Sequence, residues 1–253
     1  MERIAIFAAL RWECAPVLRQ MRQVERAQLR GQARNFVVWR GRTARREVWL
    51  VKTGVGTAQA EHAAQLARDT SDFALFVSTG CAGALAPELI PGDLTVASSV
   101  VGHASGDRFE TDPRHREHAC RAAERAALRI SIGAVVCSPH VLATTAAKRA
   151  AAAPGTVAVE MEGVPIAACA AHHRIPFLSV RAILDTADTE LRHSGQFIEP
   201  QSGAVKPWAL ATYLATHPSA VPDLLALQRT RRAAQRSLER FFATWFAEPL
   251  VDH

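Results

Sequence analysis

Two short apolar segments of this chain run directly into carboxylic acids. The first covers residues 157–159 and the second residues 177–184. Segments of this kind are typical of buried strands, and in an open α/β sheet ligands bind outside the carboxyl ends of the strands. One helix length separates the two segments, so we expect them to be neighbouring strands whose acids converge on one site. The acids that follow them are Glu160, Glu162, Asp185 and Asp188.

Length and composition indicate one large globular unit. The chain has 253 residues, of which 49% are hydrophobic, and no stretch resembles a linker. We expect a single domain over residues 1–253, with a core at 1–190 and a helical C-terminal extension at 203–248. The longest apolar runs fall far short of the roughly 20 residues of a membrane span, and the first strand has no signal-peptide features. A cytoplasmic location is therefore expected.

Cysteines and charge exclude several classes of protein. The five cysteines form no Cys-x-x-Cys pair, which favours reduced thiols over a disulfide framework or a zinc site. The formal net charge of +6 comes mainly from arginines spread among acids, without the aromatic-interleaved basic ribbon of a nucleic-acid-binding protein. His115 and His118 lie three residues apart, but their charged neighbours indicate a solvated helix face. No metal is expected.

Strand and helix patterns alternate along the first three quarters of the chain. This alternation predicts an α/β three-layer sandwich, in which helices flank a mixed, mostly parallel central sheet. Residues 205–214 and 224–246 are predicted to be helices, and no strand is expected after Leu184. The other predicted strands are 4–8, 36–40, 48–52, 74–78, 94–97 and 132–137, and the other predicted helices are 13–21, 57–69, 115–128 and 164–172.

Two glycine-rich turns follow predicted strands, at residues 54–56 and 80–83. The first lacks the third glycine of a dinucleotide fingerprint, and the chain has no Gly-Lys-Ser/Thr of a P-loop. A nucleotide-dependent oxidoreductase is therefore disfavoured. Turns of this kind are more often structural than functional, although N–H groups at a helix N-terminus suit anions or sugar hydroxyls.

Taken together, the acids and glycine turns carry a family resemblance. The matching segments, in the expected order, are residues 6–13, 53–56, 78–85 continuing to 91–93, 159–163 and 181–188. They resemble the nucleoside phosphorylase and nucleosidase superfamily, most closely the branch of 5′-methylthioadenosine/S-adenosylhomocysteine nucleosidase. The resemblance implies an enzyme that cleaves the N-glycosidic bond of a purine nucleoside and releases the base. It also implies a homodimer.

The resemblance assigns roles to individual residues. Asp185 matches the general acid that protonates N7 of the purine, and Glu13 matches the glutamate that activates water. Glu162 matches the glutamate that holds the ribose hydroxyls, and Met161 packs against the sugar. Arg181 lies inside an apolar strand and needs a partner, for which Glu160 is expected. The further substrate-binding positions are Gly56, Gly80, Cys81, Val141, Leu142 and Glu160.

The choice between water and phosphate as nucleophile stays open at this point. Ser78 stands where phosphorylases of the superfamily have an arginine, and Cys81 replaces a serine. Together with Glu13, these residues favour a hydrolase, whereas the nearby Arg11 could serve an anion. No cofactor is expected, and inorganic phosphate remains open as a co-substrate. A non-catalytic nucleoside-binding domain is disfavoured because both Glu13 and Asp185 are present.

The C-terminal part departs from the methylthioadenosine enzymes beyond Leu191. It resembles the hopanoid-associated subfamily, which removes adenine from adenosylhopane, and Leu184 makes the pocket more apolar. The helix at 224–246 carries an apolar stripe that fits either an interfacial helix or a helix packed on a core. A lipid-linked nucleoside, with transient contact to the inner membrane face, is thus one expectation, and methylthioadenosine or S-adenosylhomocysteine is the alternative. The stripe consists of Ala234, Leu238, Phe241, Phe242 and Trp245.

Overall fold

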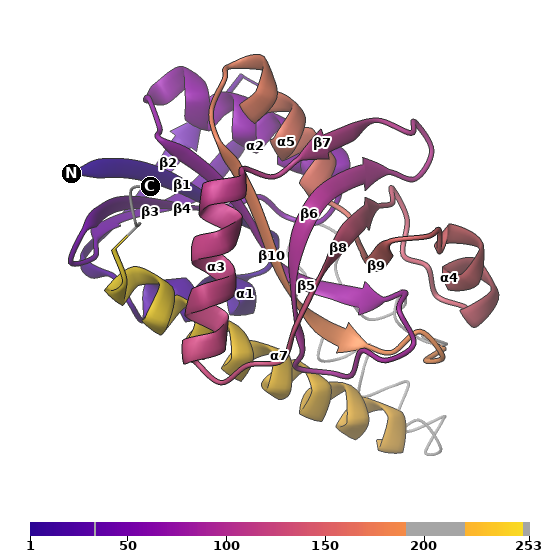
Figure 1. Cartoon of the computed structure of the whole chain (residues 1–253). Helices are drawn as coiled ribbons and strands as arrows, with labels where there is room; N and C mark the ends of the chain where they lie inside the picture. Colours follow the sequence, from indigo (N-terminus) through magenta and orange to yellow (C-terminus); the bar gives the residue numbers. More distant parts are fainter. Residues whose placement is uncertain (33, 191–220, 250–253) are drawn as a thin grey trace.

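The computed structural model describes residues 1–32, 34–190 and 221–249 (Figure 1). The predicted helix at 205–214 lies outside these residues. The strands are β1 (Glu2–Ala8), β2 (Arg22–Arg30), β3 (Asn35–Arg42), β4 (Arg46–Lys52), β5 (Leu75–Ala84), β6 (Leu94–Gly102), β7 (Arg108–Glu110), β8 (Ile130–Cys137), β9 (Thr156–Glu160) and β10 (Phe177–Asp185). The helices are α1 (Arg11–Leu18), α2 (Thr57–Thr70), α3 (Pro113–Arg125), α4 (Thr145–Ala151), α5 (Gly163–His172) and α7 (Val221–Ala247).

The strands form one mixed sheet that closes on itself at one side. Its order is β10-β6-β8-β9-β5-β1-β4-β3-β2, with β7 beside β6. Because β10 also pairs with β5, the strands β10, β6, β8, β9 and β5 make a closed ring, and the remaining strands extend from β5 as an open sheet. The pairs β1–β4, β1–β5, β5–β10, β6–β8 and β8–β9 are parallel, and the other pairs are antiparallel.

The two acid-bearing strands are not neighbours, so that prediction is wrong. β5 lies between β9 and β10 and pairs with both. Gly83 of β5 is opposite Val159 of β9 on one side and opposite Asp185 of β10 on the other. The acids therefore still reach the same edge of the sheet, brought together by a strand that carries no acid.

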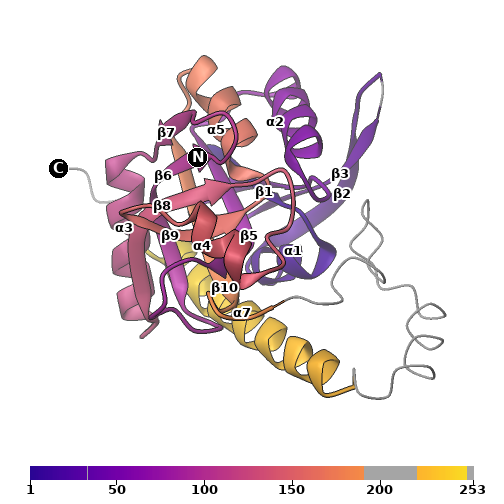
Figure 2. The same cartoon turned by 90° about the vertical axis from the view of Figure 1, so that its right-hand side faces the viewer.

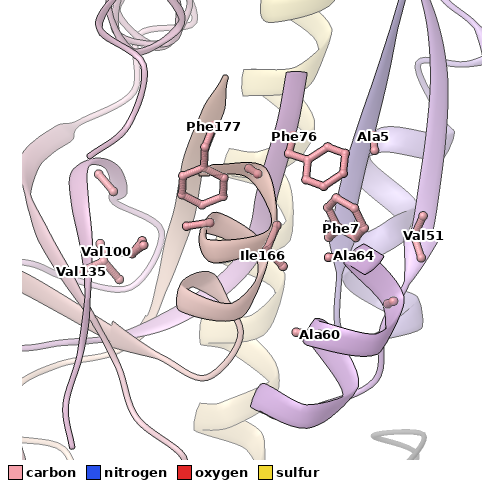
Figure 3. Packing of buried hydrophobic residues seen from close by; sticks show 14 of the residues in the cluster. Ala5, Phe7, Val51, Ala60, Ala64, Phe76, Val100, Val135, Ile166 and Phe177 are labelled. Carbon is pink, nitrogen blue, oxygen red and sulfur yellow. The ribbon is translucent and has the colours of Figure 1, made fainter. Parts of the chain in front are cut away.

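Helices cover both faces of the sheet, which confirms the predicted three-layer α/β fold. Successive residues of β1 point to opposite faces, so that Phe7 packs towards α2 and α5 while Ile6 packs towards α1, α3 and α7. In the first layer Phe7 and Phe76 meet edge to face with ring centroids 4.9 Å apart (Figure 3). Ala64 of α2 and Ile166 of α5 complete this layer.

Helix α7 crosses beneath α1 and α3 and packs on β10 (Figures 1 and 2). Its apolar stripe at Ala234, Leu238, Phe241, Phe242 and Trp245 is completely buried. The stripe is therefore a core face, which confirms the packed-helix alternative over the interfacial one. Over the part of the chain that the structure describes, no helix is long and apolar enough to cross a bilayer.

Several local predictions are corrected by the structure. Strand β2 was not predicted, because it is an edge strand whose side chains are almost all exposed. The expected glycine turn at 80–83 is instead the end of β5, and β6 continues to Gly102. His115 and His118 are buried rather than solvated, since they face α7, where His118 lies 5.9 Å from the Trp245 ring. Among the described residues no His, Cys, Asp and Glu group has metal-site geometry.

Candidate active site

The predicted site residues gather where β5, β9 and β10 end, beside the start of α1. Glu13 comes from the first turn of α1, Glu160 from the last position of β9, and Asp185 from the last position of β10. All three are more than nine-tenths buried. Buried acids require partners, and in the structure these partners form two groups.

The first group, here called the arginine cluster, consists of Arg181, Glu160, Glu162 and Glu13. The Arg181 guanidinium pairs with Glu160, as predicted, and lies 3.7 Å from Glu162 Oε2. It also donates to the Thr79 carbonyl at 3.2 Å and to Ser78 Oγ at 2.6 Å. One cation therefore ties β10 to β5 and to the acids that end β9.

Glu160 is engaged entirely by protein groups. Besides Arg181, its carboxylate accepts the backbone N–H of Glu162 at 2.8 Å and that of Gly163 at 2.8 and 2.9 Å. Gly163 opens helix α5, so the carboxylate lies where a helix N-terminus favours negative charge. Both carboxylate oxygens are thus occupied, and Glu160 anchors the site instead of facing the open side of the sheet.

Glu162 joins the acids to the first glycine turn. Its Oε1 accepts the Gly56 N–H at 2.9 Å, and Gly56 has a φ of 101°, a conformation that favours glycine. Burial, together with the Glu160 charge, raises the pKa of Glu162 to about 7, against the opposing effect of Arg181. Its carboxyl is therefore poised to change protonation near neutral pH.

Glu13 reaches back over the first turn of α1. Its Oε2 accepts the Leu10 N–H at 2.9 Å, and its Oε1 accepts the Cys81 N–H at 2.8 Å. Burial raises the pKa of Glu13, while the charge of Arg181 and these hydrogen bonds oppose the shift. Gly80 makes room for this contact: its φ is 140°, and a Cβ there would lie 2.8 Å from Glu13 Oε1.

The second group, here called the lysine pair, consists of Asp185 and Lys148. The Lys148 ammonium pairs with Asp185 Oδ2 and also donates to the carbonyls of Thr186, at 2.7 Å, and Thr189, at 3.1 Å. The two charged side chains are only 2% and 8% exposed. Burial raises the pKa of Asp185, and Lys148 opposes this rise.

Sequence reasoning missed Lys148. Helix α4, which carries it, lies in an alanine-rich stretch without a clear amphipathic period, so neither the helix nor its buried face was predicted. One signal was available, because Lys148 is one of only three lysines in a chain whose basic residues are otherwise arginines. In a chain whose basic residues are nearly all arginines, a lysine indicates a position at which an amine is needed.

Cys81 lies between the two groups. It is half-buried on β5, and burial raises the pKa of its thiol, with the Glu13 and Asp185 charges adding to the rise. The thiol therefore stays protonated and is a packing group rather than a nucleophile. Glu13 accepts the Cys81 N–H, and Asp185 lies opposite Gly83, so the two acids meet β5 two residues apart.

The remaining predicted positions line the outer part of this region. Met161 is half-buried directly after Glu160, and Val141 is 53% exposed on the loop before α4. Leu142 is half-buried against an apolar cluster that includes Leu85 and Val159. The structure thus places apolar side chains next to the buried acids, on the side of the lysine pair.

Comparison with known proteins assigns the chain to a family. A family model described as "Phosphorylase superfamily" matches residues 3–206. The chain belongs to the phosphorylase superfamily. Among curated proteins it resembles the 5′-methylthioadenosine/S-adenosylhomocysteine nucleosidases of Aeromonas salmonicida (strain A449), at 27% identity over 74% of this chain and 88% of the relative, and of Staphylococcus epidermidis, at 25% over 58% and 72%.

Solved structures share the phosphorylase-superfamily fold over nearly the whole chain. The Neisseria meningitidis 5′-methylthioadenosine/S-adenosylhomocysteine nucleosidase in complex with methylthio-immucillin-A has a TM-score of 0.74 at 21% identity, covering 97% of this chain and 98% of that one. The futalosine hydrolase of Helicobacter pylori strain 26695 has a TM-score of 0.71 at 18% identity, covering 95% and 97%. These likenesses support the α/β architecture described above.

The phosphorylase-superfamily fold here carries two acids in contrasting surroundings. Glu13 shares a single arginine with two other carboxylates, whereas Asp185 has a lysine of its own. Carboxyl groups whose pKa values are set by different neighbours are the usual means by which one site supplies both an acid and a base. The arrangement is chemically suited to breaking a glycosidic bond.

Proposed function

We propose that the protein hydrolyses the N-glycosidic bond of a purine nucleoside and releases the free base. The observation that carries this proposal is the pair of buried carboxyls, Glu13 and Asp185, which meet the end of β5 at Cys81 and Gly83 in different charge surroundings. The curated relatives are nucleosidases, which supports the same reaction class. Both carboxyl groups have a raised pKa, as an acid and a base near neutral pH require.

The mechanism divides the work between these acids. Asp185 donates a proton to N7 of the purine, so that the C–N bond breaks with its electrons passing to the base. Glu13 accepts a proton from water as the water oxygen bonds to the anomeric carbon. Glu162, fixed by the Gly56 N–H, holds the ribose hydroxyls, and Met161 packs against the sugar. The products are ribose bearing its 5′ group and a neutral purine.

Water is favoured over phosphate as nucleophile. Ser78 occupies the position of a phosphate-binding arginine in phosphorylases, and its hydroxyl is buried and accepts a hydrogen bond from Arg181. Arg11, the cation that could serve an anion, is exposed on α1. Phosphate-dependent cleavage is the second candidate, and it differs by its product, ribose 1-phosphate.

For the substrate we propose an adenine nucleoside with a bulky 5′ group. Adenosylhopane is the first candidate, and methylthioadenosine and S-adenosylhomocysteine are the alternative. The first rests on the resemblance of the C-terminal part to the hopanoid-associated subfamily and on Leu184, which makes the pocket more apolar. A cytoplasmic homodimer with transient contact to the inner membrane face fits such a substrate.

The direct test is base release from a panel of nucleosides. The protein is incubated with methylthioadenosine, S-adenosylhomocysteine, adenosine, inosine and an adenosylhopane extract, with and without phosphate. Free base, the released sugar with its 5′ group and the corresponding sugar 1-phosphate are measured by chromatography. Release of adenine with the free sugar, independent of phosphate, is expected. Release of no base from any substrate would refute the enzyme proposal, and a strict need for phosphate would establish the second candidate.

Two substitutions test the assigned acid and base. Asp185→Asn and Glu13→Gln should each lower kcat by about 10²–10⁴-fold, with KM changed far less, because each removes a proton transfer and leaves the shape of the site intact. Arg149→Met is the matched control, since Arg149 forms an exposed ion pair with Asp188. Undiminished turnover in Asp185→Asn would show that another group is the acid.

A further inference from the structure

Of the two cations in the described site, only Lys148 can lose its charge by giving up a proton. A lysine ammonium in a buried place can lose its proton, whereas an arginine guanidinium keeps its proton in proteins. The two cations of the site, Lys148 and Arg181, are equally enclosed, each side chain being 2% exposed. Lys148 therefore has a chemical capacity that Arg181 lacks, in direct contact with the proposed acid.

The surroundings of Lys148 suit both of its protonation states. As an ammonium it has three N–H donors, and three acceptors are present: Asp185 Oδ2 and the carbonyls of Thr186 and Thr189. As a neutral amine it would keep two N–H groups for the two carbonyls. Its lone pair would then accept the O–H of a protonated Asp185. No hydrogen-bonding group is left unsatisfied in either state.

Burial narrows the energy gap between these two states. A charged pair taken out of water loses hydration, which disfavours the separated charges relative to a neutral acid and amine. Of the charged groups on the same helix and turn, Arg149 and Asp188 pair with each other in solvent, and Glu190 follows Thr189. The Asp185 side of the pair meets Gly83 of β5, which carries no charge.

We propose that Lys148 is the proton reserve of the site, a positioning residue that supplies to Asp185 the proton which Asp185 delivers to the purine. This inference rests on the proposed function. In the step, an N–H bond of the Lys148 ammonium breaks as an O–H bond forms on Asp185, and the Asp185 proton moves to N7 of the base. Lys148 ends as a neutral amine and Asp185 as a carboxylate. A proton from solvent restores the ammonium after the base leaves.

Two substitutions of Lys148 separate proton supply from charge and from structure. Lys148→Arg keeps the cation but cannot release a proton, so kcat is expected to fall about tenfold or more at every pH, with KM changed less than about twofold. Lys148→Met leaves Asp185 to hold its own proton. Its kcat should approach that of the wild type near pH 5 and fall about tenfold or more below it by about pH 8, as the carboxyl ionises.

Arg149→Met, on the same helix and joined to the same turn, is the control and should leave the pH profile of kcat unchanged. Melting temperatures establish that each variant is folded. Full activity of Lys148→Arg would overturn the inference, because charge alone would then suffice. A loss in Lys148→Met that is equal at all pH values would also overturn it. Inactivity of the wild type towards every nucleoside would instead count against the proposed function.

Discussion

The site holds two buried ion pairs that have the same kinds of charge but different surroundings. Glu160 and Arg181 form one, which joins β9 to β10, and Asp185 and Lys148 form the other, which joins β10 to α4. In the first, the cation is permanent and the carboxylate is saturated by two backbone N–H groups at a helix N-terminus. In the second, the cation can be discharged and its other partners are two carbonyls. Burial alone therefore does not distinguish an ion pair with a structural role from an ion pair that can transfer a proton.

The two groups also differ in charge balance. Arg181 serves three carboxyls, from Glu13, Glu160 and Glu162, whereas Lys148 serves Asp185 alone. The arginine cluster thus carries an excess of acid, which helps to raise the pKa of Glu162. The excess of negative charge is unfavourable for the folded state around the cluster, but it keeps the pKa of the Glu162 carboxyl near neutral pH. Under the proposed function, this carboxyl binds the hydroxyls of the ribose.

The largest expected effect comes from removing the permanent cation. Arg181→Met should destabilise the protein by about 3–5 kcal/mol, because Glu160 would keep its charge in a fully buried place without a counter-ion. Lys148→Met should cost less, since Asp185 can take up a proton and become neutral. Chemical denaturation at neutral pH measures both losses. Equal losses would show that the two ion pairs contribute to stability in the same way.

The acid excess of the arginine cluster predicts a pH-dependent stability difference. The pKa of Glu162 is raised from its ordinary value near 4.5 to about 7, so its stabilising contribution is present below pH 4.5 and is lost as the pH rises through 7. Glu162→Gln removes this loss. Relative to wild type, the variant should gain up to about 3 kcal/mol between these pH values.

Denaturation of both proteins across that pH range tests this expectation, and base release should fall in the same variant because the ribose contact is lost. Asp188→Asn, a change at an exposed carboxylate, serves as the control and should shift stability little. A constant difference between Glu162→Gln and wild type would show that Glu162 has an ordinary pKa in the folded protein.

Much of this arrangement could be predicted from local sequence. Acids directly after apolar strands identified Glu160, Glu162 and Asp185, and an arginine inside the second strand required a buried partner, which is Glu160. The strand–helix alternation gave the layered fold. These predictions hold because each depends on one segment and on the rule that buried charges are paired.

The remainder depended on contacts between distant segments. The position of β5 between β9 and β10 results from the closure of the strand ring. Neither the β9 nor the β10 sequence contains a pattern that predicts this closure. Lys148 comes from a short alanine-rich helix whose packing partner is the turn after β10. The stripe of α7 was ambiguous because a core face and a membrane face have the same spacing, and only its burial decides between them.

The smallest expected effect concerns Gly80 and Gly83 of β5, which leave room for the carboxyls of Glu13 and Asp185 because they have no side chain. Gly80→Ala should cost about 1–3 kcal/mol, because φ is 140° there, and should lower kcat, because the new Cβ would lie 2.8 Å from Glu13 Oε1 and 3.0 Å from Arg181 Nη1. At position 83 a new Cβ would have one tight contact, with Asp185 Oδ2 at 3.1 Å, and ordinary contacts at 3.5 Å with Asp185 Oδ1 and Val159 Cγ1, and φ is not positive there.

A shift of a few tenths of an ångström would relieve the contact at position 83. The atom met at position 83 is the end of the Asp185 side chain, whereas at position 80 the φ of 140° strains any residue with a Cβ, whatever its neighbours do. Gly83→Ala should therefore leave stability nearly unchanged, as thermal denaturation of the two variants would measure. A loss at position 83 that matches the loss at position 80 would mean that the lysine pair is held as rigidly as the arginine cluster.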